Sequence, residues 1–165
     1  MNWPLQKDCD TFYGNPRGRN GQASLTWIKA NLVPVVPPYT LFYADKPIKS
    51  FQMHRKCVDA TRHALDAILS ETKSDKRLLT KSGANVFGGS FNFRLMRGGS
   101  KLSMHSWGCA IDLDPANNGF HDETPKFLTY PFVVKAFEDV GATWGGRWKG
   151  RACDGMHFQF ADVGA

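Results

Sequence analysis

Apolar residues recur clearly at helical spacing in two stretches of this 165-residue chain, and this pattern limits the fold more than any other feature of the sequence. Between Met53 and Leu69 apolar residues recur at intervals of three and four, which predicts one amphipathic helix. We expect His54 and His63 on its solvated side. A second helix is predicted from Pro131 to Val140, because proline suits a first helical turn and Gly141 suits a helix end.

The remainder of the chain predicts short strands, turns and loops. Strands are expected over residues 91–96, 108–113, 143–148 and 157–160. Residues 14–21 are rich in glycine and predict a loop, residues 25–32 predict one or two helical turns, and the prolines within 33–43 suit edge strands and turns. We therefore predict an α+β fold, with a small antiparallel sheet flanked by two or three helices.

The length of the chain fits one domain, and no repeat or flexible linker divides it. We predict a single domain over residues 1–165, in which residues 1–50 form an N-terminal extension packed on the rest. The four cysteines form no CxxC pair and are expected to be buried thiols, although their oxidation state stays open.

Basic residues outnumber acidic ones by 21 to 15, which gives a formal net charge of +6. Such a charge favours nucleic acid, a lipid surface or cell wall as a partner, or it serves solubility alone. The segment RWKGR at 147–151 mixes basic and aromatic residues as nucleic-acid binders do. No recognisable nucleic-acid fold surrounds it, so we expect no nucleic-acid partner.

Two short segments contain the residues of a candidate metal site. In SMHSWGCAID, His105 and Asp112 lie seven residues apart with Gly108 between them, so a turn followed by a strand could bring both side chains to one metal. The second segment, CDGMHFQF, adds Asp154 and His157. In an extended strand, His157 would point away from the core that its two phenylalanine neighbours face.

Two imidazoles and one carboxylate are a common ligand set for catalytic zinc, because they leave a fourth position for water or substrate. Zinc lowers the pKa of such a water to about 7, and a nearby carboxylate, here Asp154, would move its proton. By residue type alone, the same histidines and acids could be purely structural. Four further candidates lie outside this pattern and are expected to be solvated: Asp114, His121, Asp122 and Glu123.

The first segment matches the pattern S-x-H-x-x-G-x-A-x-D, and DGMH is similar to the D-x-x-H that follows it in one family. The chain thereby resembles the zinc peptidases that include D-alanyl-D-alanine carboxypeptidases and phage L-alanyl-D-glutamate endopeptidases. Their fold is shared with lysostaphin-type peptidases and the hedgehog amino-terminal domain. The resemblance extends from YGNP near Tyr13, through FNFRLMRGGS and WGGRW, to the end of the chain.

This resemblance implies one Zn²⁺ per chain, carried by the small sheet and held by His105, Asp112 and His157. It makes Asp154 the catalytic acid/base and places an arginine near the substrate, for which we favour Arg94 over Arg97. Tentative substrate-binding residues are Ser103, Arg97, Trp144 and Trp148. Ser103 could equally serve its turn alone, and Trp144 could equally pack in the core.

The carboxypeptidase branch of the family commonly has Glu where this chain has Asp154, which favours the endopeptidase branch. Gly155 stands where that branch often has Pro. We therefore predict a phage endolysin-type L-alanyl-D-glutamate endopeptidase acting on bacterial peptidoglycan as a monomer. A D-alanyl-D-alanine carboxypeptidase and a non-catalytic zinc-binding domain that recognises cell wall are the alternatives.

The first ten residues lack the basic and apolar regions of a signal peptide, and no later stretch is apolar enough to span a bilayer. We expect synthesis in the cytoplasm without stable membrane insertion, and action on the cell wall after release.

Overall fold

The structure, a computed structural model, describes residues 2–164 and has the predicted α+β fold. The helices are α1 (Cys9–Tyr13), α2 (Leu25–Asn31), α3 (Val58–Glu71), α4 (Lys76–Ser82) and α5 (Pro131–Glu138). The strands are β1 (Leu32–Val35), β2 (Leu41–Tyr43), β3 (Lys46–Ile48), β4 (Phe51–His54), β5 (Phe87–Gly89), β6 (Ala110–Leu113), β7 (Thr143–Trp144) and β8 (His157–Gln159). Several 3₁₀ turns connect these elements.

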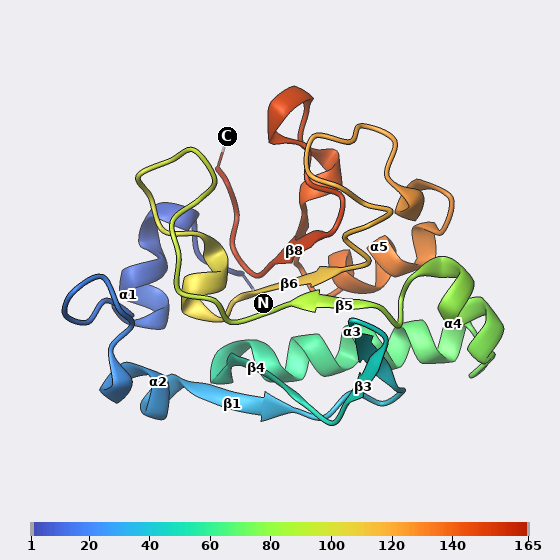
Figure 1. Ribbon diagram of the computed structural model, residues 1–165, viewed down its shortest axis with the longest axis horizontal. Coiled ribbons are helices and arrows are strands. Elements are labelled where there is room, and N and C mark those ends of the chain that lie inside the picture. Colours follow the sequence, from blue (N-terminus) through green and yellow to red (C-terminus); the bar gives the residue numbers. More distant parts are fainter. Residues whose placement is uncertain (1, 165) are drawn as a thin grey trace.

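The central sheet has four antiparallel strands in the order β5-β6-β8-β7. Figure 1 shows it across the middle of the molecule, with α3 running below it. On β8, Phe158 stacks against Phe137 of α5 with ring centroids 4.4 Å apart. Side chains alternate along a strand, so His157 and Gln159 point to the other face. One face of the sheet therefore covers the core, and the other presents polar side chains.

The first fifty residues contact the central sheet directly. The Tyr13 hydroxyl donates a hydrogen bond to the Phe160 carbonyl (2.6 Å), and the Trp27 indole donates to the Tyr13 carbonyl (3.0 Å). Strand β1 pairs with β4, and these two strands lie on either side of residue 50 in the sequence. The predicted division of the domain at that residue stays a prediction.

The predicted second helix and two of the predicted strands are found within two residues of their expected bounds, as α5, β6 and β8. The first predicted helix begins later than expected. Residues Met53 and His54 belong to β4, a 3₁₀ turn follows, and α3 begins only at Val58. Met53 and Cys57 are both buried at helical spacing, but pairing with β1 keeps Met53 extended.

The expected position of His54 is wrong, whereas His63 is exposed as predicted. His54 is completely buried against Tyr13 and Trp27. Its Nε2 lies 3.1 Å from the Tyr13 carbonyl, and its Nδ1 accepts a hydrogen bond from the backbone N–H of Lys56 (3.2 Å). His54 therefore joins the N-terminal segment to the 3₁₀ turn that precedes α3, as a neutral core residue.

We expect the burial of His54 to make the protein less stable in mild acid. Burial lowers its pKa from 6.5 to about 4. Below pH 6.5 His54 binds a proton in the unfolded chain, whereas in the folded protein it stays neutral until about pH 4. The free energy of unfolding should thus fall across this window by as much as about 3 kcal/mol. Urea unfolding of the parent and His54→Gln at several pH values measures it. If the free energy of unfolding fell equally with pH in the parent and in His54→Gln, the prediction would be wrong. His63→Gln, which replaces an exposed histidine, is the control and should behave as the parent does.

Three other sequence predictions are corrected by the structure. Residues 91–96 form no strand; they are irregular apart from one bridge between Leu95 and Leu102. The strand expected at 143–148 ends at Trp144 and continues as a 3₁₀ turn. Asp114, expected to be solvated, is buried, where it pairs with Lys126 (3.1 Å) and accepts a hydrogen bond from Asn117. All four cysteines are buried, as predicted, and all four are free thiols.

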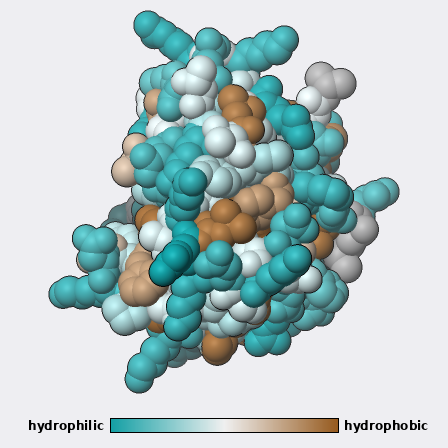
Figure 2. Space-filling view, turned by 90° about the vertical axis from the view of Figure 1, so that its right-hand side faces the viewer, coloured by the Kyte–Doolittle hydropathy of each residue, from teal (hydrophilic) through white to brown (hydrophobic). Residues whose placement is uncertain are grey.

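On the side of the molecule shown in Figure 2, hydrophilic residues cover most of the surface and apolar residues form small patches between them. Among residues 2–164, no helix combines the length and the apolar character that crossing a membrane requires.

Candidate active site

His105 is positioned by a tight 3₁₀ turn, Met104–Trp107, which leads into β6. Ser103 caps this turn by accepting a hydrogen bond from the His105 backbone N–H (3.4 Å). Gly108 ends it with a φ of +63°, where a β-carbon would lie 2.6 Å from Leu32 and 3.0 Å from the His54 backbone nitrogen. Both the left-handed backbone and the close packing require glycine here. The pattern S-x-H-x-x-G therefore describes one turn.

Asp112 and His157 are held by neighbouring strands of the central sheet. Asp112 on β6 lies directly opposite His157 on β8. Facing residues of an antiparallel pair project to the same side of the sheet, so the carboxylate and the imidazole point together away from the core.

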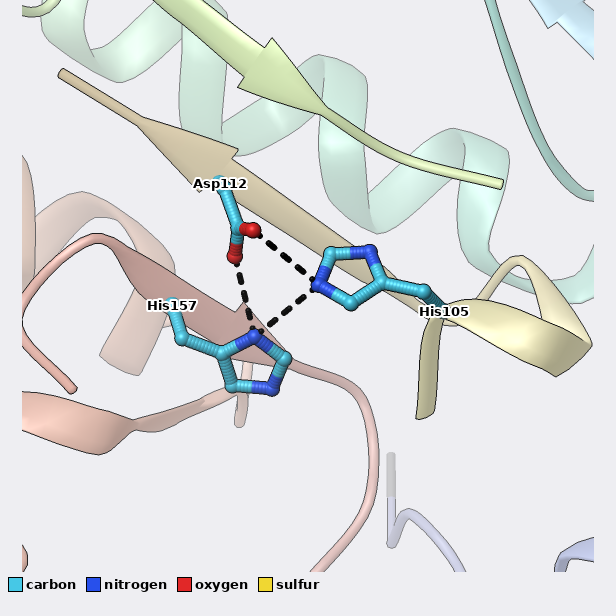
Figure 3. Close-up of side chains that lie close together, drawn as sticks. All are labelled: His105, Asp112 and His157. Carbon is cyan, nitrogen blue, oxygen red and sulfur yellow. Dashed lines mark hydrogen bonds and ion pairs between the residues drawn. The ribbon is translucent and has the colours of Figure 1, made fainter. Parts of the chain in front are cut away.

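These three side chains meet at one point (Figure 3). His105 Nε2 lies 3.2 Å from His157 Nδ1 and 3.2 Å from Asp112 Oδ2, and His157 Nδ1 lies 3.0 Å from Asp112 Oδ1. Tetrahedral zinc with bonds of 2.0–2.1 Å separates its ligand atoms by about 3.3 Å. The observed spacing is close to that value. In the described part of the chain, this is the one His/Cys/Asp/Glu group that could hold a metal ion.

The outer nitrogen of each imidazole faces an oxygen acceptor. His105 Nδ1 lies 2.6 Å from the Ser90 carbonyl, and His157 Nε2 lies 3.0 Å from Gln159 Oε1. An acceptor on one ring nitrogen favours the proton there and leaves the other nitrogen with its lone pair. Those other nitrogens are the two that face Asp112. The donor set thus fits a divalent metal such as zinc.

Charge at the site also favours a cation. Burial opposes ionisation of Asp112, but the close contacts of its carboxylate with His105 and His157 outweigh burial and hold the pKa of this carboxyl well below its ordinary value. Asp112 is therefore an anion enclosed by two imidazoles, and a metal ion would balance its charge.

Asp154 lies beside the three convergent residues and lines the same pocket. Its backbone carbonyl accepts a hydrogen bond from the His157 N–H (3.1 Å), which fixes the turn between them. Its Oδ1 is buried and has no hydrogen-bond partner among the described residues. Burial raises the pKa of this carboxyl above its ordinary value. A half-buried acid with a buried oxygen that has no partner among the described residues suits proton transfer better than turn capping.

The pocket has a volume of about 540 Å³ and is lined by both candidate arginines. Arg94 is half-buried and donates a hydrogen bond to the Leu95 carbonyl (3.3 Å). Arg97 is exposed, lies over the Phe120 ring at 5.5 Å, and its charge lowers the pKa of Asp154 slightly against the effect of burial. The structure thus brings both arginines to the pocket, and the preference for Arg94 stays a prediction.

The remaining predicted substrate residues separate into two groups. Ser103 and Trp148 line the pocket, and the Trp148 ring centroid lies 5.8 Å from that of His157. Trp144 does not line it. It is buried against Phe158, and its indole donates a hydrogen bond to the Gly155 carbonyl (2.8 Å). Trp144 therefore packs in the core, which is the alternative that the sequence left open for it.

Sequence reasoning did not find Ser90 or Gln159, the residues behind the two histidines. Gln159 had a signal, because it lies two residues after His157 in a strand and so shares its face. Ser90 contributes only its carbonyl, which no side-chain pattern reveals.

A small sheet that presents two imidazoles and a carboxylate to a pocket is typical of metal-dependent hydrolases, as is an acid beside them whose Oδ1 has no hydrogen-bond partner among the described residues. A family model described as D-alanyl-D-alanine carboxypeptidase matches residues 97–160, which include all four of these residues. The match confirms the predicted zinc peptidase family for this segment of the chain. Curated proteins and solved structures give no match.

Proposed function

We propose that this protein is a zinc-dependent endopeptidase that cuts the bond between L-Ala and D-Glu in the stem peptide of bacterial peptidoglycan. The observation that carries the proposal is the convergence of His105, Asp112 and His157 beside Asp154, within the segment that matches the peptidase family. The three convergent residues would hold one zinc ion per chain.

Zinc in such a site makes a water nucleophilic near neutral pH and polarises the scissile carbonyl. Asp154 would take the proton of the attacking water and return it to the leaving amine. A guanidinium at the pocket wall, from Arg94 or Arg97, would stabilise the negative charge that develops on the carbonyl oxygen. Trp148 would place an aromatic wall against the substrate.

A second cavity next to the site supports cleavage within a chain rather than at its end. This cavity has a volume of about 980 Å³ and shares Gln6, Arg94 and Met96 with the first. Its lining contains four basic side chains against one acidic one: Lys7, Arg17, Arg94 and Lys101 against Asp10. A substrate that continues past the cut bond needs such space, and the stem peptide carries free carboxylates that basic side chains attract.

Two other functions remain as alternatives. The name of the matching family favours removal of terminal D-Ala, whereas Asp154 in place of Glu favours the endopeptidase. A non-catalytic wall-binding role would not explain why the Asp154 Oδ1 is buried without a hydrogen-bond partner among the described residues. We further propose that the protein is a phage-type lysin that acts as a monomer after release from the cytoplasm.

The test is to digest purified peptidoglycan and identify the products by mass spectrometry. The endopeptidase produces new amino-terminal D-Glu. Release of free D-Ala would establish the carboxypeptidase instead, and an unchanged polymer that nevertheless retains the protein would establish the binding domain.

A further inference from the structure

Gln159 is a polar residue at a buried position of the central sheet, where an apolar side chain would be the usual choice. It is the last residue of β8, is 1% exposed, and pairs in register with Ala110 on one side and Thr143 on the other. Burying an amide is unfavourable unless both its ends form hydrogen bonds. Both ends of this amide have partners.

The hydrogen bonds of Gln159 fix which way its amide points. Its Nε2 donates to the Ala161 carbonyl (2.9 Å), an atom that can only accept. The amide oxygen must therefore face His157, whose Nε2 lies 3.0 Å away. Gln6 adds a longer hydrogen bond to the same oxygen (3.4 Å). The orientation of the amide thus follows from a backbone carbonyl and not from His157 itself.

An amide oxygen can only accept, so the contact with His157 requires a proton on Nε2 of that ring. A neutral imidazole carries one proton, and its presence on Nε2 leaves the lone pair on Nδ1. Nδ1 is the atom that lies 3.0 Å from Asp112 and 3.2 Å from His105. The hydrogen bond also fixes the rotation of the ring about its Cβ–Cγ bond.

From this chain of contacts we infer that Gln159 is a positioning residue of the metal site: it holds the proton of His157 on Nε2 and so directs Nδ1 to the metal. The inference rests on the proposed zinc site and adds a residue that acts through His157 without touching the substrate. Partners of this kind change metal affinity by about 10–100-fold when they are removed.

The experiment compares zinc affinity, measured by competition with a chelating dye, in the parent, Gln159→Leu and Gln159→Glu. We expect Gln159→Leu to bind zinc about 10–100-fold more weakly. Gln159→Glu keeps an acceptor for the His157 proton and should stay within a few-fold of the parent. In NMR spectra of the zinc-loaded proteins, the His157 Nε2 proton should be protected from exchange in the parent and Gln159→Glu, and exchange rapidly in Gln159→Leu.

Asn85→Leu is the control, because it removes another buried amide, one that does not line the site pocket. It should lower stability and leave zinc affinity unchanged. Equal losses of zinc affinity in Asn85→Leu and Gln159→Leu would overturn the inference. So would a Gln159→Leu protein whose zinc affinity and His157 proton exchange rate both equal those of the parent. A parent protein that binds no zinc would instead overturn the proposed function, so the two failures are distinguishable.

Discussion

Replacing Asp154 with Asn should lower turnover on peptidoglycan by about 10²–10⁴-fold, the contribution of a positioned general acid/base. Zinc content and thermal melting should stay at parental values. Asn has the shape of Asp but cannot take up the proton of the attacking water. The Asp154 side chain has no hydrogen bond that Asn would disturb, since its Oδ1 is buried without a partner among the described residues.

Asp122→Asn is the matched control for this prediction. Asp122 lies in a neighbouring loop, where its carboxylate accepts hydrogen bonds from the backbone and side chain of Thr124 (2.8 and 3.0 Å). That is the capping role that Asp154 would have if it were structural. A folded, zinc-loaded Asp154→Asn protein with near-parental release of amino groups would remove Asp154 from the mechanism.

The second large effect is expected from His157→Ala, which should reduce bound zinc from one per chain to a small fraction and abolish digestion. Removing a ligand should weaken zinc binding by more than about 100-fold, which is the upper range for removing a residue that only hydrogen-bonds to a ligand. Metal analysis after gel filtration measures the loss, and added zinc should restore little activity. His63→Ala, on the exposed side of α3, should retain both zinc and activity. Stoichiometric zinc in His157→Ala would show that the metal binds elsewhere.

The sequence predicts the centre of this site well because its motifs describe local geometry. The spacing from His105 to Asp112 corresponds to one turn and one strand, and Gly108 supplies the left-handed residue between them. The alternation around His157 correctly placed Phe158 in the core. These features depend on neighbours in the chain, so a single sequence suffices to see them.

Elements that depend on distant contacts were missed or misplaced. Strand β5 contains Gly88 and Gly89, and glycine is rare in strands. A β-carbon on Gly88 would lie 3.0 Å from Asp112 Cβ, so the glycine allows β5 to approach the metal-site strand. The burial of His54 likewise depends on Tyr13, forty-one residues away. No local pattern contains either fact.

Helix α4 was missed although the sequence marks both of its ends. Asp75 caps its start by accepting a hydrogen bond from the Arg77 N–H (2.8 Å), and Gly83 ends it in the left-handed conformation. Its length of seven residues gives too little periodicity to find it by apolar spacing. The sequence does not distinguish Arg94 from Arg97 for a different reason. Both arginines lie on an irregular segment, where the directions of side chains follow from tertiary contacts.

We propose that the three convergent residues, His105, Asp112 and His157, hold a zinc ion that the peptidase reaction requires. The most direct measurement removes metal from the purified protein with a chelator, verifies its absence by metal analysis, and follows the release of amino groups from peptidoglycan before and after stoichiometric zinc is added. We predict that release stops in the metal-free protein and returns with one zinc per chain. Undiminished release by protein shown to contain no metal would contradict the proposed role of zinc.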